Sequence, residues 1–90
     1  MSEFPQIKEW RSGEGPVHHV LAVDQFGYVT HAEIGPSPFT GGSARFSYAD
    51  FLAGAGHTSI LATLGESVLS EALALVGRNA LLVSGKPPAA

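Results

Sequence analysis

The chain has 90 residues, enough for one domain and too few for two, and its 44% of hydrophobic residues argues against intrinsic disorder. Its formal net charge is −3 and its five lysines and arginines are scattered, which excludes the basic patch that a nucleic-acid-binding surface needs. The absence of cysteine excludes disulfides, thiolate metal sites and thiol catalysis, and no segment approaches the roughly 20 apolar residues that span a bilayer.

Residues 1–16 are predicted to form an N-terminal arm or loop, because they combine Pro5 with a glycine-rich, charged run over residues 11–16. Trp10 is expected to pack this arm against the body of the domain, since tryptophan in a small domain more often packs than contacts a ligand. An arm that orders only when a partner binds is the alternative. The first residues lack the basic and apolar regions of a signal peptide, and the cysteine-free, Gly- and Ala-rich composition favours a bacterial cytoplasmic protein.

A β-hairpin over residues 17–34 is predicted as the organising element. Residues 17–23 are rich in β-branched and apolar side chains, and residues 28–34 alternate between apolar and polar. Asp24 favours the first position of a type I turn, and Gly27 can adopt the left-handed conformation that closes a three-residue loop.

A loop is predicted over residues 35–43 from their glycine, proline and serine content, and a short third strand over residues 44–46. Ser47 and Asp50 have the spacing of a capping box, in which a hydroxyl and a carboxylate satisfy free amides at the start of a helix. We therefore expect a short helix over about residues 48–53.

A longer helix is predicted from about residue 58 to Gly77, a residue type that often caps the C-terminal end of a helix. Gly65 interrupts it at a cost of about 1 kcal/mol relative to alanine, and is a point at which the helix can divide in two. Residues 79–84 are predicted as a last short strand, and residues 85–90 as a flexible tail.

Together these elements predict a single α+β domain over residues 17–84. Its antiparallel sheet has three to four short strands with the hairpin central, and the short and the long helix pack on one face. The apolar stripes of the long helix cover more than about 100° of its circumference, more than a small sheet needs to cover. The predicted interaction surface combines the exposed stripe of the long helix with the loop over residues 35–43, since loops held on a rigid scaffold often carry recognition. It includes Phe39, Leu69, Leu73 and Val76. The alternative is that the short helix and the termini cover the second stripe.

The hairpin register brings three chemically versatile side chains to one face of the sheet. With a three-residue loop, Leu21 lies opposite His31 and His19 opposite Glu33, so that His19, His31 and Glu33 share a face. Two imidazoles and a carboxylate are a ligand set for zinc or non-haem iron, and they also suit proton transfer. The structural alternative is a cross-strand His–Glu pair at the solvent end of an apolar sheet face.

The remaining histidines and the glycine-rich segments indicate structure rather than chemistry. His18 is placed on the opposite face of the hairpin, and His57 is expected in a loop or capping role before the long helix. The glycines at 41–42 lack the lysine of a phosphate-binding P-loop, and those at 54–56 lack the third glycine of a dinucleotide fingerprint.

The sequence predicts a small non-enzymatic binding or regulatory module that acts through protein contacts, either with a partner protein or with itself as a homodimer. The alternative is a small metal-dependent or acid–base enzyme that uses His19, His31 and Glu33. A ligand-binding protein with a pocket between sheet and helices is a third hypothesis. No cofactor is predicted, and neither nucleic acid nor membrane is an expected partner.

Overall fold

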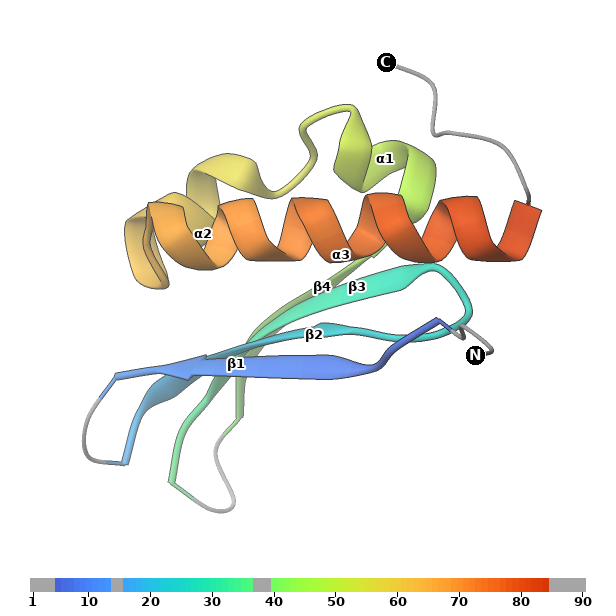
Figure 1. The fold of residues 1–90 in the computed structure, drawn as a ribbon. Helices are drawn as coiled ribbons and strands as arrows, with labels where there is room; N and C mark the ends of the chain where they lie inside the picture. The colour runs from blue at the N-terminus through green and yellow to red at the C-terminus, as the bar shows by residue number, and fades with distance from the viewer. Residues whose placement is uncertain (1–4, 14–15, 37–39, 85–90) are drawn as a thin grey trace.

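The computed structural model describes residues 5–13, 16–36 and 40–84 of the chain. In these residues a four-stranded antiparallel sheet is followed by three helices (Figure 1), which confirms the predicted α+β class. The strands lie side by side in chain order, and the helices follow: β1 (Lys8–Ser12), β2 (His18–Val23), β3 (Tyr28–Ile34), β4 (Thr40–Ser47), α1 (Tyr48–Leu52), α2 (His57–Thr63) and α3 (Glu66–Ser84).

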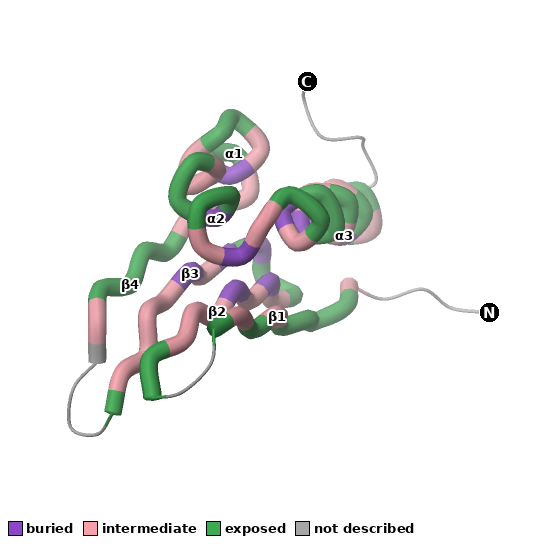
Figure 2. The backbone as a smooth tube through the Cα atoms, turned by 90° about the vertical axis from the view of Figure 1, so that its left-hand side faces the viewer, coloured by how far each residue is buried: buried purple, intermediate pink, exposed green. Residues whose placement is uncertain are grey.

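The molecule has two layers, one of strands and one of helices. All three helices lie on the same side of the sheet, with α1 and α2 beside α3 (Figures 1 and 2). No other described element covers the opposite face of the sheet. We call the helix-covered side the covered face and the opposite side the open face.

The predicted hairpin between β2 and β3 is confirmed, together with its turn. The Asp24 amide donates to the Tyr28 carbonyl (3.0 Å), and the Asp24 carboxylate accepts from the amides of Phe26 (2.8 Å) and Tyr28 (3.0 Å). Gly27 has a φ of 95°, and a Cβ there would lie 2.7 Å from the Tyr48 ring. The turn thus needs glycine for its backbone and for its packing.

The start of α1 uses the predicted Ser47, whereas α2 begins at His57, after a Gly56 N-cap that forms no side-chain hydrogen bond. Ser47 is the N-cap of α1, and its hydroxyl accepts from the Asp50 amide at 3.2 Å. The long helix divides at Gly65, which has a φ of 95° and separates α2 from α3. A left-handed residue ends one helix and allows the chain to begin the next in a new direction.

Three predicted segments differ from the structure. The predicted N-terminal arm contains β1, which pairs with β2 and brings Trp10 opposite Leu21. The predicted loop over residues 35–43 ends earlier, because β4 begins at Thr40. The predicted last strand over residues 79–84 is instead the end of α3. The predicted flexible tail over residues 85–90 lies outside the described residues.

Long-range contacts account for both the added strand and the extended helix. Asn79 of α3 is fully buried, and its amide side chain accepts from the Gln6 amide (3.0 Å) and donates to the Gln6 carbonyl (2.9 Å). The Trp10 indole donates to the Glu71 carboxylate of α3 at 2.7 Å. These contacts hold the first strand against the last helix, so the N-terminal segment is an edge of the sheet, and the expected packing of Trp10 is confirmed.

The core lies between the sheet and the helices. It consists of buried apolar side chains from the covered face and from the helix faces above it: Leu21, Val23, Val29, Phe51, Ile60, Leu64, Leu69, Ala72 and Val76. Leu69 and Val76 are therefore core residues, and Leu73 packs against the core. Leu69 and Val76 therefore expose too little surface for the predicted contact, whereas the role of the partly buried Leu73 in an interaction stays a prediction. Phe39 lies outside the described residues.

Candidate functional site

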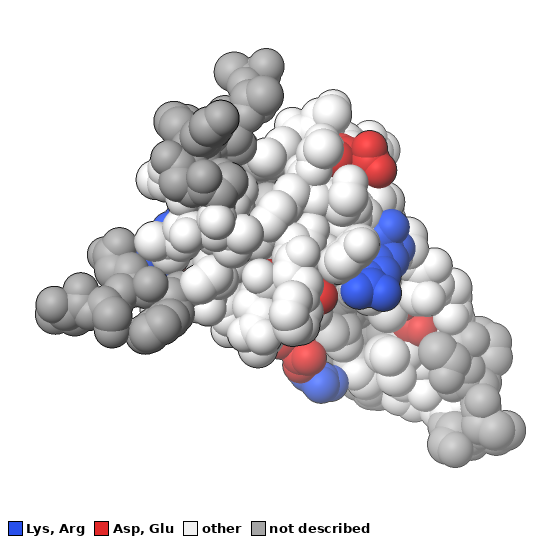
Figure 3. Space-filling model, turned by 90° about the vertical axis from the view of Figure 1, so that its right-hand side faces the viewer, with Lys and Arg blue, Asp and Glu red and all other residues white. Residues whose placement is uncertain are grey.

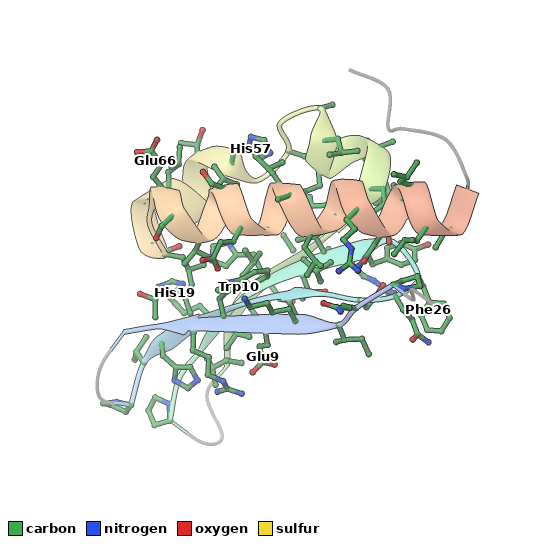
Figure 4. The ribbon with its side chains drawn as sticks, in the orientation of Figure 1. Glu9, Trp10, His19, Phe26, His57 and Glu66 are labelled. Carbon is green, nitrogen blue, oxygen red and sulfur yellow. The ribbon has the colours of Figure 1, made fainter. Side chains whose placement is uncertain are left out.

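The predicted cluster of two histidines and a carboxylate forms on the covered face. The register pairs His19 with Glu33 and Leu21 with His31, as the turn predicted. The two imidazole rings have their centroids 5.6 Å apart, and the His19 Nε2 atom is 3.7 Å from a Glu33 carboxylate oxygen. In Figure 4 His19 projects from the sheet toward the helix layer.

His31 is the most constrained member of the cluster, with only 8% of its surface exposed. Its Nδ1 atom lies 3.3 Å from the Ser59 hydroxyl and its Nε2 atom 3.2 Å from the Thr63 hydroxyl. The Thr63 hydroxyl donates its own hydrogen to the Ser59 carbonyl at 2.8 Å, so toward His31 it acts as an acceptor. Nε2 therefore carries the ring proton, and Nδ1 accepts from Ser59.

This environment favours the neutral form of His31. Burial is the main cause that lowers the pKa of His31 below its usual value of 6.5, and the nearby His19 is the second cause. At physiological pH the ring is then uncharged, and its Nδ1 lone pair faces the Ser59 hydroxyl. A neutral imidazole beside a hydroxyl can accept a proton, which is the chemistry of a general base.

An open cleft of about 360 Å³ lies beside the cluster, at the place where the β3–β4 register shifts between Ala32 and Ile34. Polar groups from β2, β3, β4 and α2 line it together with small residues: His19, His31, Ala32, Glu33, Gly42, Ser43, Ala44 and Ser59. The His19 Nδ1 atom is buried and has no hydrogen-bond partner among the described residues. A buried acceptor or donor without a partner costs free energy, so a hydrogen bond from the His19 Nδ1 atom to a further polar group would be favourable.

The arrangement of His19, His31 and Glu33 differs from that of the predicted metal site. Within residues 5–13, 16–36 and 40–84, no three or more histidine, aspartate and glutamate side chains are grouped so that they could hold a metal ion. Both ring nitrogens of His31 already face hydroxyl groups, and binding a metal would require His31 to exchange one of these contacts. The ligand role of His19, His31 and Glu33 stays a prediction. In the structure His31 bonds to Ser59 and Thr63, and His19 contacts the His31 ring and lies 3.7 Å from Glu33.

Sequence reasoning missed the hydroxyl groups that support the cluster. Ser59 and Thr63 are four residues apart on α2, a spacing that places both on one side of a helix. The Ser12 hydroxyl of β1 also donates to the Thr63 carbonyl at 3.1 Å. The spacing of the two α2 residues was the only local signal, and it does not indicate which strand the helix covers.

The other two histidines have structural contacts. His57 begins α2, and its Nε2 atom lies 2.7 Å from the Phe51 carbonyl of α1 while its ring meets the Phe51 ring edge-on. It thus contacts a carbonyl near the end of α1. The N-cap of α2 is Gly56, so His57 does not have the loop or capping role expected before the long helix. His18 pairs with Ile34 on the open face, and its ring lies 3.3 Å from the Arg11 guanidinium.

The open face is the second candidate site. Glu9 points away from the helices, whereas Trp10 and His19 point toward them (Figure 4). The strand registers align Glu9, Ala22, Thr30 and Arg45 in one row across the sheet, and Arg11, Val20 and Ala32 in the next. The apolar and small members of these rows, Val20, Ala22, Thr30 and Ala32, are only partly exposed.

Charges stand at the two edges of this face. Glu9 on β1 pairs with Arg11 at 2.8 Å, and both side chains are largely exposed. Arg45 on β4 lies over the Tyr28 ring, with its guanidinium carbon 3.9 Å from the ring centre. The face therefore has a small apolar centre, an acidic and a basic residue at its β1 edge, and a basic residue at its β4 edge.

On the side of the molecule drawn in Figure 3, charges of one sign do not gather in a patch. Figure 3, which views the molecule from the end with the β2–β3 turn, shows lysine, arginine, aspartate and glutamate scattered over a mostly uncharged surface. In the part of the chain that the structure describes, no helix has the length and apolar character needed to cross a membrane.

Comparisons with protein-family models, with curated proteins and with solved structures gave no match to this chain. The cleft and the open face are therefore the two features from which a function can be inferred.

Proposed function

We propose that the protein is a small non-enzymatic binding module that acts through protein–protein contacts, and that the open face of its sheet is the contact surface. The observation that carries the proposal is the one-sided helix layer, which leaves four adjacent strands without a covering element among the described residues. This surface replaces the α3 stripe that the sequence suggested.

The composition of β2 supports the proposal. A strand with one solvated face alternates between apolar and polar residues, whereas a strand buried on both faces is apolar throughout. β2 continues as Val20, Leu21, Ala22 and Val23, of which Leu21 and Val23 face the core and the other two face the open side. These four residues therefore resemble a strand that is covered on both faces.

The edges of the open face support a protein partner rather than a lipid or nucleic-acid one. Both signs of charge occur there, with Glu9 beside Arg11 on β1 and Arg45 on β4. A polar rim of mixed charge around a small apolar centre is the ordinary anatomy of a protein interface.

Thiol labelling tests the proposal, because the chain has no cysteine of its own. An Ala22→Cys variant places a single thiol on the open face, and Ala62→Cys places one on the exposed side of α2 as a matched control. We expect the Ala22→Cys thiol to react at least about tenfold more slowly in concentrated host extract than in dilute purified protein, because a bound partner excludes the reagent. The control should change little. Equal slowing of both thiols would contradict the proposal.

A second candidate function is acid–base chemistry in the cleft, favoured by the contact of the Ser59 hydroxyl with the neutral His31 ring. This alternative includes the metal-dependent form of the site. Elemental analysis of protein purified without chelators tests the metal-dependent form: stoichiometric zinc or iron that is lost in a His31→Ala variant would favour the enzyme. Protein free of both metals, combined with protection of the Ala22→Cys thiol, would favour the binding module.

A further inference from the structure

We infer that the partner of the open face is a second copy of this chain, packed face to face about a twofold axis that runs parallel to the strands. This inference rests on the proposed function, because it uses the same surface and adds the identity and geometry of the occupant. It follows from the positions of the charged residues along one row of the sheet.

The row that contains Glu9 on β1 and Arg45 on β4 has its acidic and basic ends on opposite edges of the sheet. A twofold rotation about an in-plane axis along the strands places β1 of one copy over β4 of the other and keeps each row at the same height. Glu9 of each copy then meets Arg45 of the other, which gives two symmetric ion pairs. A self-complementary patch of this kind is what an isologous dimer requires.

The same rotation brings the small central residues together. Ala22 of one copy lies over Thr30 of the other, and Val20 lies over Ala32, because β2 and β3 exchange places about the axis. Small side chains at these positions allow two sheets to approach to the usual spacing of about 10 Å. Sheets packed in this way keep their strands within about 30° of one another, in agreement with an axis along the strands.

The size of the surface agrees with a weak dimer. The four strands have five to eight residues. At about 4.8 Å between strands and about 3.3 Å per residue, they have a flat footprint of roughly 400 Å². The accessible surface of the side chains exceeds this footprint, so the pair would bury on the order of 1,200 Å² in total, at the lower limit for a stable interface. We therefore expect dissociation in the micromolar range rather than a permanent dimer.

Sedimentation of the purified protein with exchanged charges tests the inference. The variants are Glu9→Arg, Arg45→Glu and the two combined, and Glu66→Arg is the control because Glu66 is exposed at the start of α3 on the other side of the molecule. We expect each single substitution to raise the dimer dissociation constant by about tenfold or more, since it replaces two attractive pairs with two repulsive ones. The combined variant should return to within about threefold of the parent, and the control should stay within the same limits.

Two results would overturn the inference. One is a monomer at all concentrations up to several hundred micromolar. The other is a dimer that neither single substitution weakens, which would place the contact elsewhere, for example along the β4 edge. If the purified protein is a monomer while the Ala22→Cys thiol is still protected in host extract, the second copy is excluded and the proposed binding of another protein stands. Far-ultraviolet circular dichroism of each variant confirms that it is folded.

Discussion

On the covered face of the sheet, Leu21, Val23 and Val29 are fully buried. Val20 and Ala22 alternate with Leu21 and Val23 along β2, face the open side and remain partly exposed. Both sets of side chains are apolar and belong to the same hydrogen-bonded strands. Only the covered face has helices above it. The difference shows that an apolar strand pattern indicates what a face can bury, but the rest of the chain decides which face is covered within one molecule.

The largest difference between the two faces should appear on truncation of adjacent β2 residues. Leu21→Ala should lower the free energy of unfolding by about 2–5 kcal/mol, because it removes buried methyl groups and leaves a cavity. Val20→Ala should cost less than about 1 kcal/mol in dilute protein, because its side chain is partly exposed. Urea unfolding at low micromolar concentration measures both. Equal losses would mean that the open face is already covered within the monomer.

A second effect concerns the attachment of β1 to the helix layer. Asn79→Ala should cost about 1–3 kcal/mol, because it leaves the Gln6 amide and carbonyl without their partner. Arg78→Ala, at the exposed neighbouring position, is the matched control and should stay within about 0.5 kcal/mol. The measurement is again urea unfolding, and a variant with parent stability would show that this contact does not anchor the N-terminal segment.

The third effect is a pH dependence that arises from His31 on the covered face. The pKa of His31 is lowered in the folded protein, so below its usual value of 6.5 the unfolded chain binds more protons and unfolding becomes more favourable. Stability should therefore be full above pH 6.5 and fall as the pH drops toward the lowered pKa.

The His31→Gln variant isolates this contribution, since glutamine keeps a polar side chain but does not titrate. Its loss of stability between pH 7 and pH 5 should be smaller than that of the parent. Thermal unfolding at a series of pH values gives the comparison, and parallel profiles for parent and His31→Gln would refute the assignment.

The smallest effect is expected at the β1 edge of the covered face, where Glu71 of α3 contacts Trp10 and Lys8. Glu71 accepts from the Trp10 indole at 2.7 Å and lies 3.7 Å from the Lys8 ammonium group, with both charged side chains more than half exposed. Glu71→Gln keeps an acceptor for the indole and removes only the charge, so it should cost less than about 0.5 kcal/mol. Glu66→Gln is the control. A loss above 1 kcal/mol would show that the charge itself holds β1 in place.

The parts of the fold that were predictable from the sequence are those specified by neighbouring residues. Asp24 and Gly27 define the turn, and the turn defines the register that brings His19, His31 and Glu33 together. Ser47 starts α1 through its own hydroxyl. Each of these features acts over a few residues, so its residue types and spacing are sufficient.

The parts that sequence analysis missed depend on contacts between distant residues. β1 is a charged, polar segment with little strand character of its own, and its position depends on pairing with β2 and on Asn79, which is 73 residues from Gln6. Residues 79–84 have the composition of a strand but continue α3. Ser59 and Thr63 join the cluster only because α2 folds over β3. Local propensity does not contain this information.

Distances between spin labels show whether the open face is the interface between two copies. Nitroxides on Ala22→Cys lie on facing sheets about 10 Å apart, so we expect a distribution centred below about 25 Å. Labels on Ala62→Cys lie on the outer helix layers of the same dimer, and two helix-on-sheet layers should separate them by about 30 Å or more. Pulsed electron paramagnetic resonance at several hundred micromolar protein measures both. A short distance at position 62 with none at position 22 would contradict the account.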